Sequence, residues 1–240
     1  MNRYVILLTV IEMTYQNIIR GEFISRPNRF IANVLINGQQ QVCHVKNTGR
    51  CKELLVAGAE VWVEKCSDPA RKTAYDLIAV KKGDRLINID SQAPNKAVAE
   101  WLEREKPFGA ELKLLREQTY GGSRFDIMLK SDKTDKRIYI EVKGCTLERD
   151  GIALFPDAPT ERGVKHLREL AECRRNGNGA ALFVLVQMSD ISYFSPNYET
   201  HREFGEVMKE AQRCGVRLMC YDSIVTPDSL TVGKPVEIRL

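Results

Sequence analysis

Three charged residues in the middle of the chain have the types and spacing of a metal-dependent hydrolytic site. Asp126 lies in the segment 123–130, and Glu141 and Lys143 lie in the segment 137–143. Polar and apolar residues alternate in both segments, which predicts strands with one buried face. Because side chains two residues apart share a face, Glu141 and Lys143 should project together. Pairing of the two strands would bring Asp126 beside them.

The chemistry of phosphoryl transfer needs these residue types. Mg²⁺ and Mn²⁺ prefer oxygen ligands, and one or two carboxylates together with a substrate phosphate suffice to bind them. The pattern thus predicts Asp126 and Glu141 as ligands of Mg²⁺ or Mn²⁺. Lys143 would orient a water or stabilise developing charge, which makes all three residues candidate catalytic groups. The alternative is a solvated strand face with an ion pair, and the spacing of three residues does not decide between the two.

The same alternation predicts which side of each strand is buried. We expect Asp126 to point away from the apolar residues of its own strand. The residues expected to face the core are Phe125, Ile127, Leu129, Ile138, Ile140 and Val142.

Longer motifs surround the three charged residues. The chain reads EQTYGGSRFD at 117–126, EVKGCTL at 141–147 and FPDAPTERGVKHLREL at 155–170, after RPNRF at 26–30 and NTGR at 47–50. In this order they resemble the sugar fermentation stimulation protein family of bacteria and archaea, from about residue 18 to about residue 223.

The resemblance implies an OB-like β-barrel followed by a mixed-sheet domain of the PD-(D/E)XK nuclease fold, α/β in class and α+β over the whole chain. It implies DNA binding without sequence specificity, and it places Asp126, Glu141 and Lys143 at the three signature positions. Phe125 stands where the name of the signature has proline. The traditional description of the family is a DNA-binding regulator of maltose metabolism, and its nuclease activity is an inference from fold.

The positive charge is concentrated in the first part of the chain. The formal net charge is +4; residues 1–92 hold 13 Lys and Arg against 9 Asp and Glu, and residues 93–240 hold 23 against 23. Such a surplus suits a surface that follows phosphates, although an ordinary solvated surface has the same composition. The candidate nucleic-acid-binding residues are Arg29, Lys46, Arg50 and Lys52 in this part, and Arg124, Arg162, Lys165 and His166 in the second.

Turn signals and the resemblance together divide the chain into an extension (1–15), a domain (16–92) that the resemblance makes OB-like and DNA-binding, and a domain (93–240) that it makes nuclease-like. The extension could add a strand, form a tail or reflect an upstream start codon. The strands expected in the barrel are 18–24, 30–36, 41–46, 61–65, 75–81 and 85–89, with Asn37-Gly38 as a hairpin turn and a helical turn over 52–55.

Helices and strands alternate in the second domain. We expect helices over 96–105, 161–174 and 198–214, and strands over 113–120, 123–130, 137–143, 152–155, 180–188, 216–221 and 236–240. The strand 152–155 should continue the sheet that carries the site. Glu100, Glu103 and Glu117 are candidates for a further acidic ligand.

Seven cysteines include no CxxC pair, so a zinc site is not expected and a reducing cytoplasm suits the chain. The apolar run at residues 4–11 is too short to span a bilayer. Three functions are compatible with these features: a Mg²⁺- or Mn²⁺-dependent nuclease, a DNA-binding regulator with a silent nuclease fold, and an enzyme acting on a small phosphorylated substrate. No helix-turn-helix is evident, and the oligomeric state is open.

Overall fold

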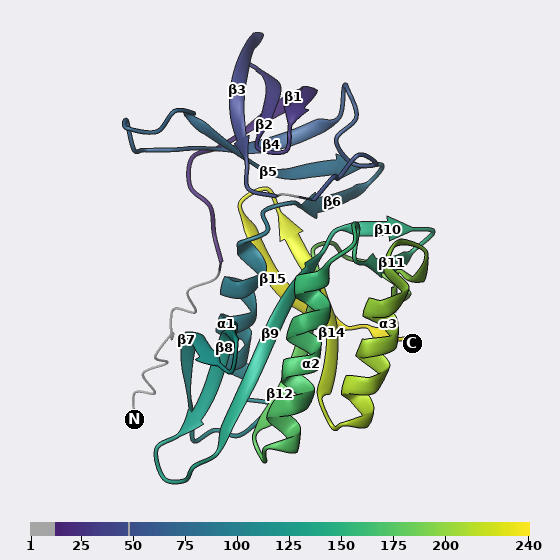
Figure 1. Cartoon of the computed structure of the whole chain (residues 1–240). Helices are drawn as coiled ribbons and strands as arrows, with labels where there is room; N and C mark the ends of the chain where they lie inside the picture. Colours follow the sequence, from purple (N-terminus) through teal and green to yellow (C-terminus); the bar gives the residue numbers. More distant parts are fainter. Residues whose placement is uncertain (1–12, 48) are drawn as a thin grey trace, which may run out of the picture.

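The first part of the chain folds as a closed barrel. The computed structural model describes residues 13–47 and 49–240. The barrel strands are β1 (Ile18–Asn28), β2 (Ile31–Ile36), β3 (Gln39–Val45), β4 (Glu60–Lys65), β5 (Tyr75–Lys82) and β6 (Arg85–Asn88). Their order is β3-β2-β1-β4-β5-β6, and a parallel pairing of β3 with β5 closes the sheet (Figure 1). This is the OB-like barrel that the sequence predicts.

Two turns predicted in the barrel are present. Asn37 and Gly38 connect β2 to β3 with φ angles of 50° and 78°, which suits the right-handed twist of a hairpin. After β3 a single helical turn forms, in which the N–H of Leu55 donates to the carbonyl oxygen of Cys51 at 2.9 Å. The turn places Leu55 against the barrel core.

The second part combines three helices with two sheets. Its elements are α1 (Ala93–Glu105), β7 (Leu112–Tyr120), β8 (Ser123–Ser131), β9 (Arg137–Cys145), β10 (Leu147–Arg149), β11 (Ile152–Phe155), α2 (Glu161–Arg175), β12 (Gly179–Val186), β13 (Tyr193–Pro196), α3 (Tyr198–Arg213), β14 (Arg217–Thr226), β15 (Ser229–Pro235) and β16 (Glu237–Ile238). The main sheet has the order β15-β14-β12-β9-β8-β7. It is mixed, because β12 runs parallel to β9 and β14 while the outer pairs are antiparallel.

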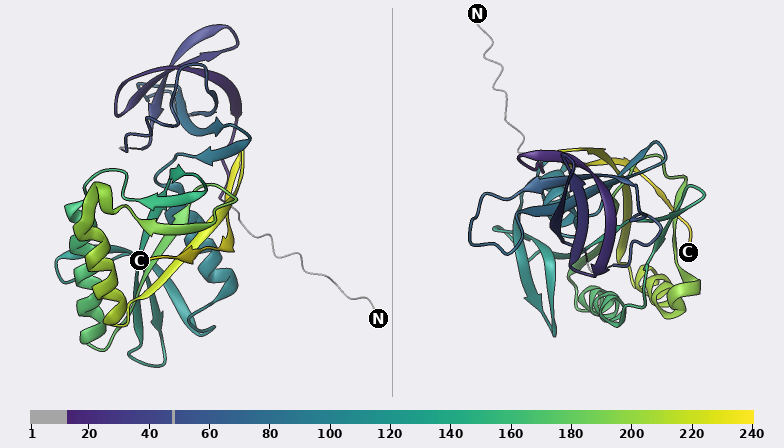
Figure 2. Two further views of the ribbon diagram at one scale, coloured as in Figure 1. Left: turned by 90° about the vertical axis from the view of Figure 1, so that its right-hand side faces the viewer. Right: turned by 90° about the horizontal axis from the view of Figure 1, so that it is seen from above.

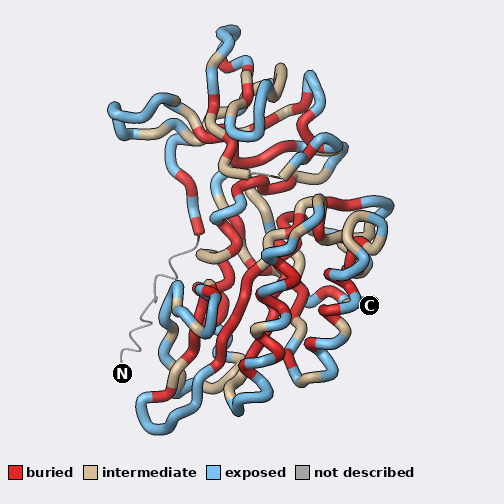
Figure 3. The backbone as a smooth tube through the Cα atoms, viewed as in Figure 1, coloured by how far each residue is buried: buried red, intermediate tan, exposed pale blue. Residues whose placement is uncertain are grey.

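Helices cover both faces of the main sheet. On one face α1 packs through Trp101 against Phe183, with ring centroids 5.4 Å apart. On the other face α2 packs through Leu167 against the side of the sheet that carries Tyr139, and α3 lies beside α2 (Figure 1). The sheet is therefore buried between layers, as the red strands of Figure 3 show.

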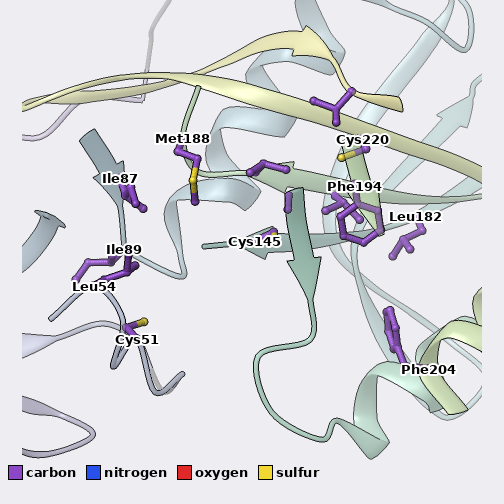
Figure 4. Close-up of a cluster of buried hydrophobic side chains, with 14 of the residues drawn as sticks. Cys51, Leu54, Ile87, Ile89, Cys145, Leu182, Met188, Phe194, Phe204 and Cys220 are labelled. Atoms are coloured by element: carbon purple, nitrogen blue, oxygen red, sulfur yellow. The ribbon is translucent and has the colours of Figure 1, made fainter. Parts of the chain in front are cut away.

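The barrel and the second domain share one apolar core. Figure 4 shows this core running from the barrel residues Cys51, Leu54, Ile87 and Ile89, through Cys145 and Met188, to Leu182, Phe194, Phe204 and Cys220. Polar contacts accompany it, since the side-chain amide of Gln187 donates to Asn88 Oδ1 at 2.9 Å and to the Asp90 carbonyl at 3.0 Å. The left view of Figure 2 shows the barrel above one end of the second domain, and the right view, from above, shows the barrel in front of that domain.

Two of the predicted strands differ from the prediction, one in the sheet it joins and the other in its length. The strand 152–155 does not continue the main sheet, because β11 lies in a separate four-stranded sheet of order β10-β11-β13-β16. The strand predicted over 236–240 is only the two-residue β16 of that same sheet. Short parallel pairings of β13 with β11 and β16 hold this sheet together, and local alternation does not reveal them.

The predicted extension lies largely outside the described residues, which begin at residue 13. Within the described part, Thr14 forms an antiparallel bridge with Ser229, and the N–H of Tyr15 donates to the carbonyl oxygen of Asp228 at 2.8 Å. Residues 13–15 thus add to the edge of the main sheet at β15. Among the described residues, no helix is long and apolar enough to cross a membrane.

Candidate active site

The register of β8 and β9 brings Asp126 opposite Glu141. Ile127 pairs with Ile140, and the next position along the two strands holds the two carboxylates. At that position a side-chain contact takes the place of a backbone hydrogen bond of the ladder, because Asp126 Oδ2 accepts from the N–H of Val142 at 2.8 Å. Its Oδ1 accepts from the side-chain amide of Asn95 on α1 at 2.8 Å. Both oxygens of Asp126 are therefore fixed by neighbouring elements.

This arrangement corrects one sequence expectation. Phe125 does not share a side with Ile127 and Leu129: it packs in the cluster on the α2 face, while the other two lie in the cluster under α1. The reason is local, because the Asp126 carboxylate takes the hydrogen bond of Val142 and the regular β8–β9 pairing ends at Ile127. The strand therefore departs from strict alternation at the candidate catalytic residue.

Glu141 is the centre of the site. It is 3% exposed, and its Oε1 contacts Lys143 Nζ at 2.5 Å and His166 Nδ1 at 2.5 Å. Its Oε2 is buried and has no hydrogen-bond partner among the described residues. A buried carboxylate oxygen without a donor is costly, so it marks a position where a cation or a water belongs.

Helix α2 delivers His166 to Glu141. The helix begins with Thr160 as N-cap, whose hydroxyl accepts from the N–H of Gly163 at 3.1 Å. Arg162 Nε donates to His166 Nε2 at 3.4 Å, so that nitrogen carries the lone pair and Nδ1 carries the proton donated to Glu141. His166 is 4% exposed and so faces the carboxylate rather than solvent.

The pKa values of the Asp126 and Glu141 carboxyl groups are shifted in opposite directions. Burial, followed by the nearby charge of Glu141, raises the pKa of Asp126 above its ordinary value, against the hydrogen bonds it accepts. Burial also disfavours ionisation of Glu141, but the hydrogen bond from His166 and the charge of Lys143 outweigh it and hold the pKa of Glu141 below its ordinary value. Paired carboxyls separated in this way are characteristic of sites that bind metals or move protons.

The residues present fit a hard divalent cation. Two adjacent carboxylates supply oxygen ligands, and the unpartnered Oε2 of Glu141 offers a free one. Sequence reasoning did not identify Asn95, which holds Asp126 from α1. An asparagine near a helix start carries no signal of this role, because only the fold brings it to β8.

A second group of possible ligands does not fit a metal. Glu161, His201 and Glu203 lie close together at the start of α2 and in α3. His201 Nδ1 accepts from the N–H of Thr160 at 3.2 Å, so the proton lies on Nε2, which faces Glu161 at 3.5 Å and Glu203 at 3.9 Å. That nitrogen is then a donor to carboxylates and has no lone pair for an ion.

The predicted nucleic-acid-binding residues of the second domain differ in their exposure and in the partners that their side chains already have. Lys165 donates to the carbonyl oxygen of Gly122 at 2.9 Å and lies 3.8 Å from Glu169. Arg124 is exposed and lies 3.5 Å from Glu117. Arg162 is exposed beside His166, whose buried ring is the member of the predicted set nearest to Glu141.

In the barrel, Lys46 differs from the other predicted cations. Its ammonium lies 3.1 Å from Asp76, 3.3 Å from Asp90 and 3.7 Å from Glu64, so its charge is used within the protein. Arg29, Arg50 and Lys52 instead line one pocket of the barrel surface.

The three candidates for a further acidic ligand differ in their position relative to Asp126. Glu103 and Glu117 are exposed, and Glu100 is half-buried beside Lys96. Glu117 has a φ of 53° and stands in the β7 position opposite Asp126, between the pairs Arg116–Ile127 and Gln118–Phe125.

The cysteines take no part in this chemistry. All seven are free, and Cys145, two residues beyond Lys143, is buried. Burial raises the pKa of the Cys145 thiol to about 12. It is therefore a small core residue rather than a nucleophile.

Comparison with known proteins gives a consistent result over nearly the whole chain. The sugar fermentation stimulation protein RE domain matches residues 92–229, and the SfsA N-terminal OB domain matches residues 24–89. The sugar fermentation stimulation protein homologue of Desulfitobacterium hafniense strain Y51 is 52% identical over 229 residues, covering 95% of this chain and 99% of that protein. The homologue of Ruminiclostridium cellulolyticum is 51% identical over 228 residues, covering 95% and 100%.

A solved structure has the same fold. It is described as Pyrococcus furiosus SfsA in complex with Ca²⁺, with a TM-score of 0.86, 25% sequence identity, and coverage of 95% of this chain and 98% of that one. The two domain matches, the homologues and this structure agree with the barrel and the mixed-sheet domain described above. The chain belongs to the sugar fermentation stimulation protein family.

Proposed function

We propose that this protein binds DNA and hydrolyses phosphodiester bonds with Mg²⁺ or Mn²⁺ at the site formed by Asp126, Glu141 and Lys143. The observation that carries the proposal is the buried Oε2 of Glu141, which has no partner in the described part of the chain and lies in a group already bonded to Lys143 and His166. The Ca²⁺ complex of the Pyrococcus relative supports a divalent-cation site in this fold.

The proposed chemistry assigns a different task to each side chain. Asp126 and Glu141 would hold the ion, which when bound polarises the phosphate and lowers the pKa of a water. Lys143 would place its ammonium where negative charge grows on the phosphate and would orient the attacking water. His166 and Asn95 would keep the two carboxylates in position.

The surroundings provide a place for a nucleic-acid backbone. A cleft of about 620 Å³ lies between the barrel and the α1–β7 side of the second domain, and Asn95, the partner of Asp126, lines it. Lys46, Lys96 and Arg116 line this cleft, but Glu64, Asp90 and Glu117 line it too, so the cleft itself carries no positive surplus. The support for contact with phosphates is the positive surplus of residues 1–92.

The experiment is cleavage of labelled single- and double-stranded DNA and RNA by the purified protein with Mn²⁺, Mg²⁺ or EDTA. A doubly substituted Asp126→Ala, Lys143→Ala protein serves as the inactive control. We expect metal-dependent cleavage that the control lacks, and the substrate that is cut then identifies the class of nucleic acid.

Binding without cleavage under every metal would refute the nuclease proposal. The remaining function would be that of a DNA-binding regulator with a catalytically silent nuclease fold. That role agrees with the traditional description of the family as a regulator of maltose metabolism. The buried Glu141 and the half-buried Asp126 near an anionic backbone favour the active alternative, because a pure phosphate clamp has no need of two carboxylates.

A further inference from the structure

We propose that the barrel holds one unpaired nucleotide of a nucleic-acid strand in the pocket between β1 and the loop that follows β3. This rests on the proposed DNA binding but not on cleavage. It also identifies the substrate class as single strands or strands with an unpaired end.

The pocket has an apolar floor. Its volume is about 490 Å³, within the roughly 300–1,000 Å³ typical of small-molecule sites. Phe23 and Leu55, which belong to the barrel core, form the floor, and Ala57 lies at the exposed side. Such a floor suits the flat, weakly polar face of a nucleobase.

Cations surround this floor. Arg29, Arg50 and Lys52 line the pocket and are exposed, and within residues 13–47 and 49–240 their side chains form no ion pair with a carboxylate. Arg29 lies over the ring of Phe30, 4.8 Å from its centroid, and Phe30 is 45% exposed. An apolar floor bordered by cations that have no carboxylate partner among the described residues matches a nucleotide with its phosphates.

The walls of the pocket are fixed in advance. The guanidinium of Arg26 donates to four backbone carbonyl oxygens: those of Asn47 (2.6 Å), Arg50 (2.7 Å), Gly49 (2.8 Å) and Arg29 (2.8 Å). One side chain thus ties the β1–β2 turn to the loop after β3. Because these carbonyls are already satisfied, little ordering is needed when a ligand binds.

The pocket leads toward the candidate active site. Gly49 lines both this pocket and a smaller cavity of about 160 Å³, which is also lined by Gly144 and Asp157. Gly144 directly follows Lys143, and the N–H of Arg50 donates to Asp157 Oδ2 at 3.1 Å across the domain junction. The barrel pocket is therefore next to the cavity at the end of β9, the strand that carries Lys143.

Fluorescence anisotropy of the full-length protein in EDTA tests this inference without any cleavage. The probes are a fluorescein-labelled oligothymidylate and a labelled duplex whose two ends are closed by hexaethylene glycol linkers, so that it holds no unpaired nucleotide, with equal numbers of phosphates. We expect the wild type to bind the oligothymidylate about tenfold more tightly than the closed duplex.

Three variants distinguish binding in the pocket from a general effect of positive charge on DNA binding. Ala57→Leu fills the pocket without adding an aromatic ring, so it should weaken oligothymidylate binding about tenfold and leave the closed duplex unaffected. The double substitution Arg50→Ala, Lys52→Ala should reduce the slope of log affinity against log salt by about 0.7 for each lost phosphate contact. Lys81→Ala, an exposed cation on β5 that lies outside the pocket lining, is the matched control and should change little.

The outcomes are decisive in each direction. Equal affinity of the wild type for the two probes, or unchanged binding by Ala57→Leu, would overturn the inference. An equal loss in Lys81→Ala would do the same, because it would reduce the effect to net charge. Competition by free thymidine monophosphate as effective as by the oligothymidylate would reassign the pocket to free nucleotides. All substituted residues are exposed, so unchanged thermal unfolding midpoints check folding.

Discussion

At the scale of single residues, the site depends on Glu141. Strand periodicity alone predicts that Glu141 and Lys143 share a face, and their 2.5 Å contact agrees with that. The same periodicity cannot predict the contact with His166, since α2 reaches β9 only through tertiary packing. It also misplaces Phe125, because the N–H of Val142 donates to the Asp126 carboxylate instead of to the backbone of β8 at that position.

The orienting role of His166 leads to a prediction with a built-in control. In His166→Asn the amide nitrogen falls near the position of Nδ1 and can still donate to Glu141, whereas in His166→Gln it falls near Nε2 and cannot. We expect His166→Gln to weaken Mn²⁺ binding and cleavage about 10- to 100-fold, and His166→Asn to restore most of both. Calorimetric titration with Mn²⁺ measures the first effect, and equal losses in the two variants would contradict the role.

At the scale of elements, most strands and all three helices could be predicted within a few residues, because hydrophobic period and turn residues are local signals. The elements missed were β10, β13 and β15. The first two are three and four residues long, too short for a period, and β13 ends in Pro196. β15 forms a hairpin with β14, and Thr14 bridges to its outer edge. The bridge joins residues that are far apart in the sequence, so a local pattern cannot predict it.

The N-cap of α2 offers an element-scale prediction. Removing the hydroxyl in Thr160→Ala leaves the N–H of Gly163 without its acceptor and should cost about 1 kcal/mol of unfolding free energy. The thermal unfolding midpoint should fall by roughly 2–4 °C. Thr160→Ser keeps the hydroxyl and should restore most of the loss. If both substitutions lowered the midpoint equally, the cap would not be the cause.

At the scale of the whole molecule, the barrel and the mixed-sheet domain are joined by polar contacts as well as by a shared apolar core. Glu148 of β10 accepts from Lys82 of β5 at 2.9 Å and lies 3.3 Å from Arg85 of β6. Burial opposes its ionisation, but the hydrogen bonds from Lys82 and Gly151 outweigh burial and hold the pKa of Glu148 below its ordinary value of 4.5. The sequence gives no sign of this contact, since its partners are more than sixty residues apart.

This lowered pKa predicts how the junction depends on pH. The ionised carboxylate is favoured in the folded state, so its contribution is complete above pH 4.5 and is lost as the pH falls through the folded-state pKa. Glu148→Gln should lower the free energy of unfolding by about 1–3 kcal/mol at pH 7, and the difference from wild type should shrink in acid. Urea unfolding at a series of pH values measures this.

Glu199→Gln is the matched control for the junction. Glu199 lies 3.1 Å from Arg149 but is 82% exposed, so its loss should have little effect at any pH. A constant difference between wild type and Glu148→Gln across the pH range would show that the charge of Glu148 does not stabilise the junction.

The most direct measurement of the central claim combines Mn²⁺ binding and DNA cleavage in wild type, Glu141→Gln and Glu103→Gln. Glu103 is an exposed glutamate on α1 and serves as the control. We predict that the wild type and Glu103→Gln bind Mn²⁺ and cut DNA, while Glu141→Gln loses both, because it lacks the charged carboxylate at the centre of the site. Undiminished Mn²⁺ binding and cleavage by Glu141→Gln would contradict the claim, as would a wild type that neither binds Mn²⁺ nor cuts DNA.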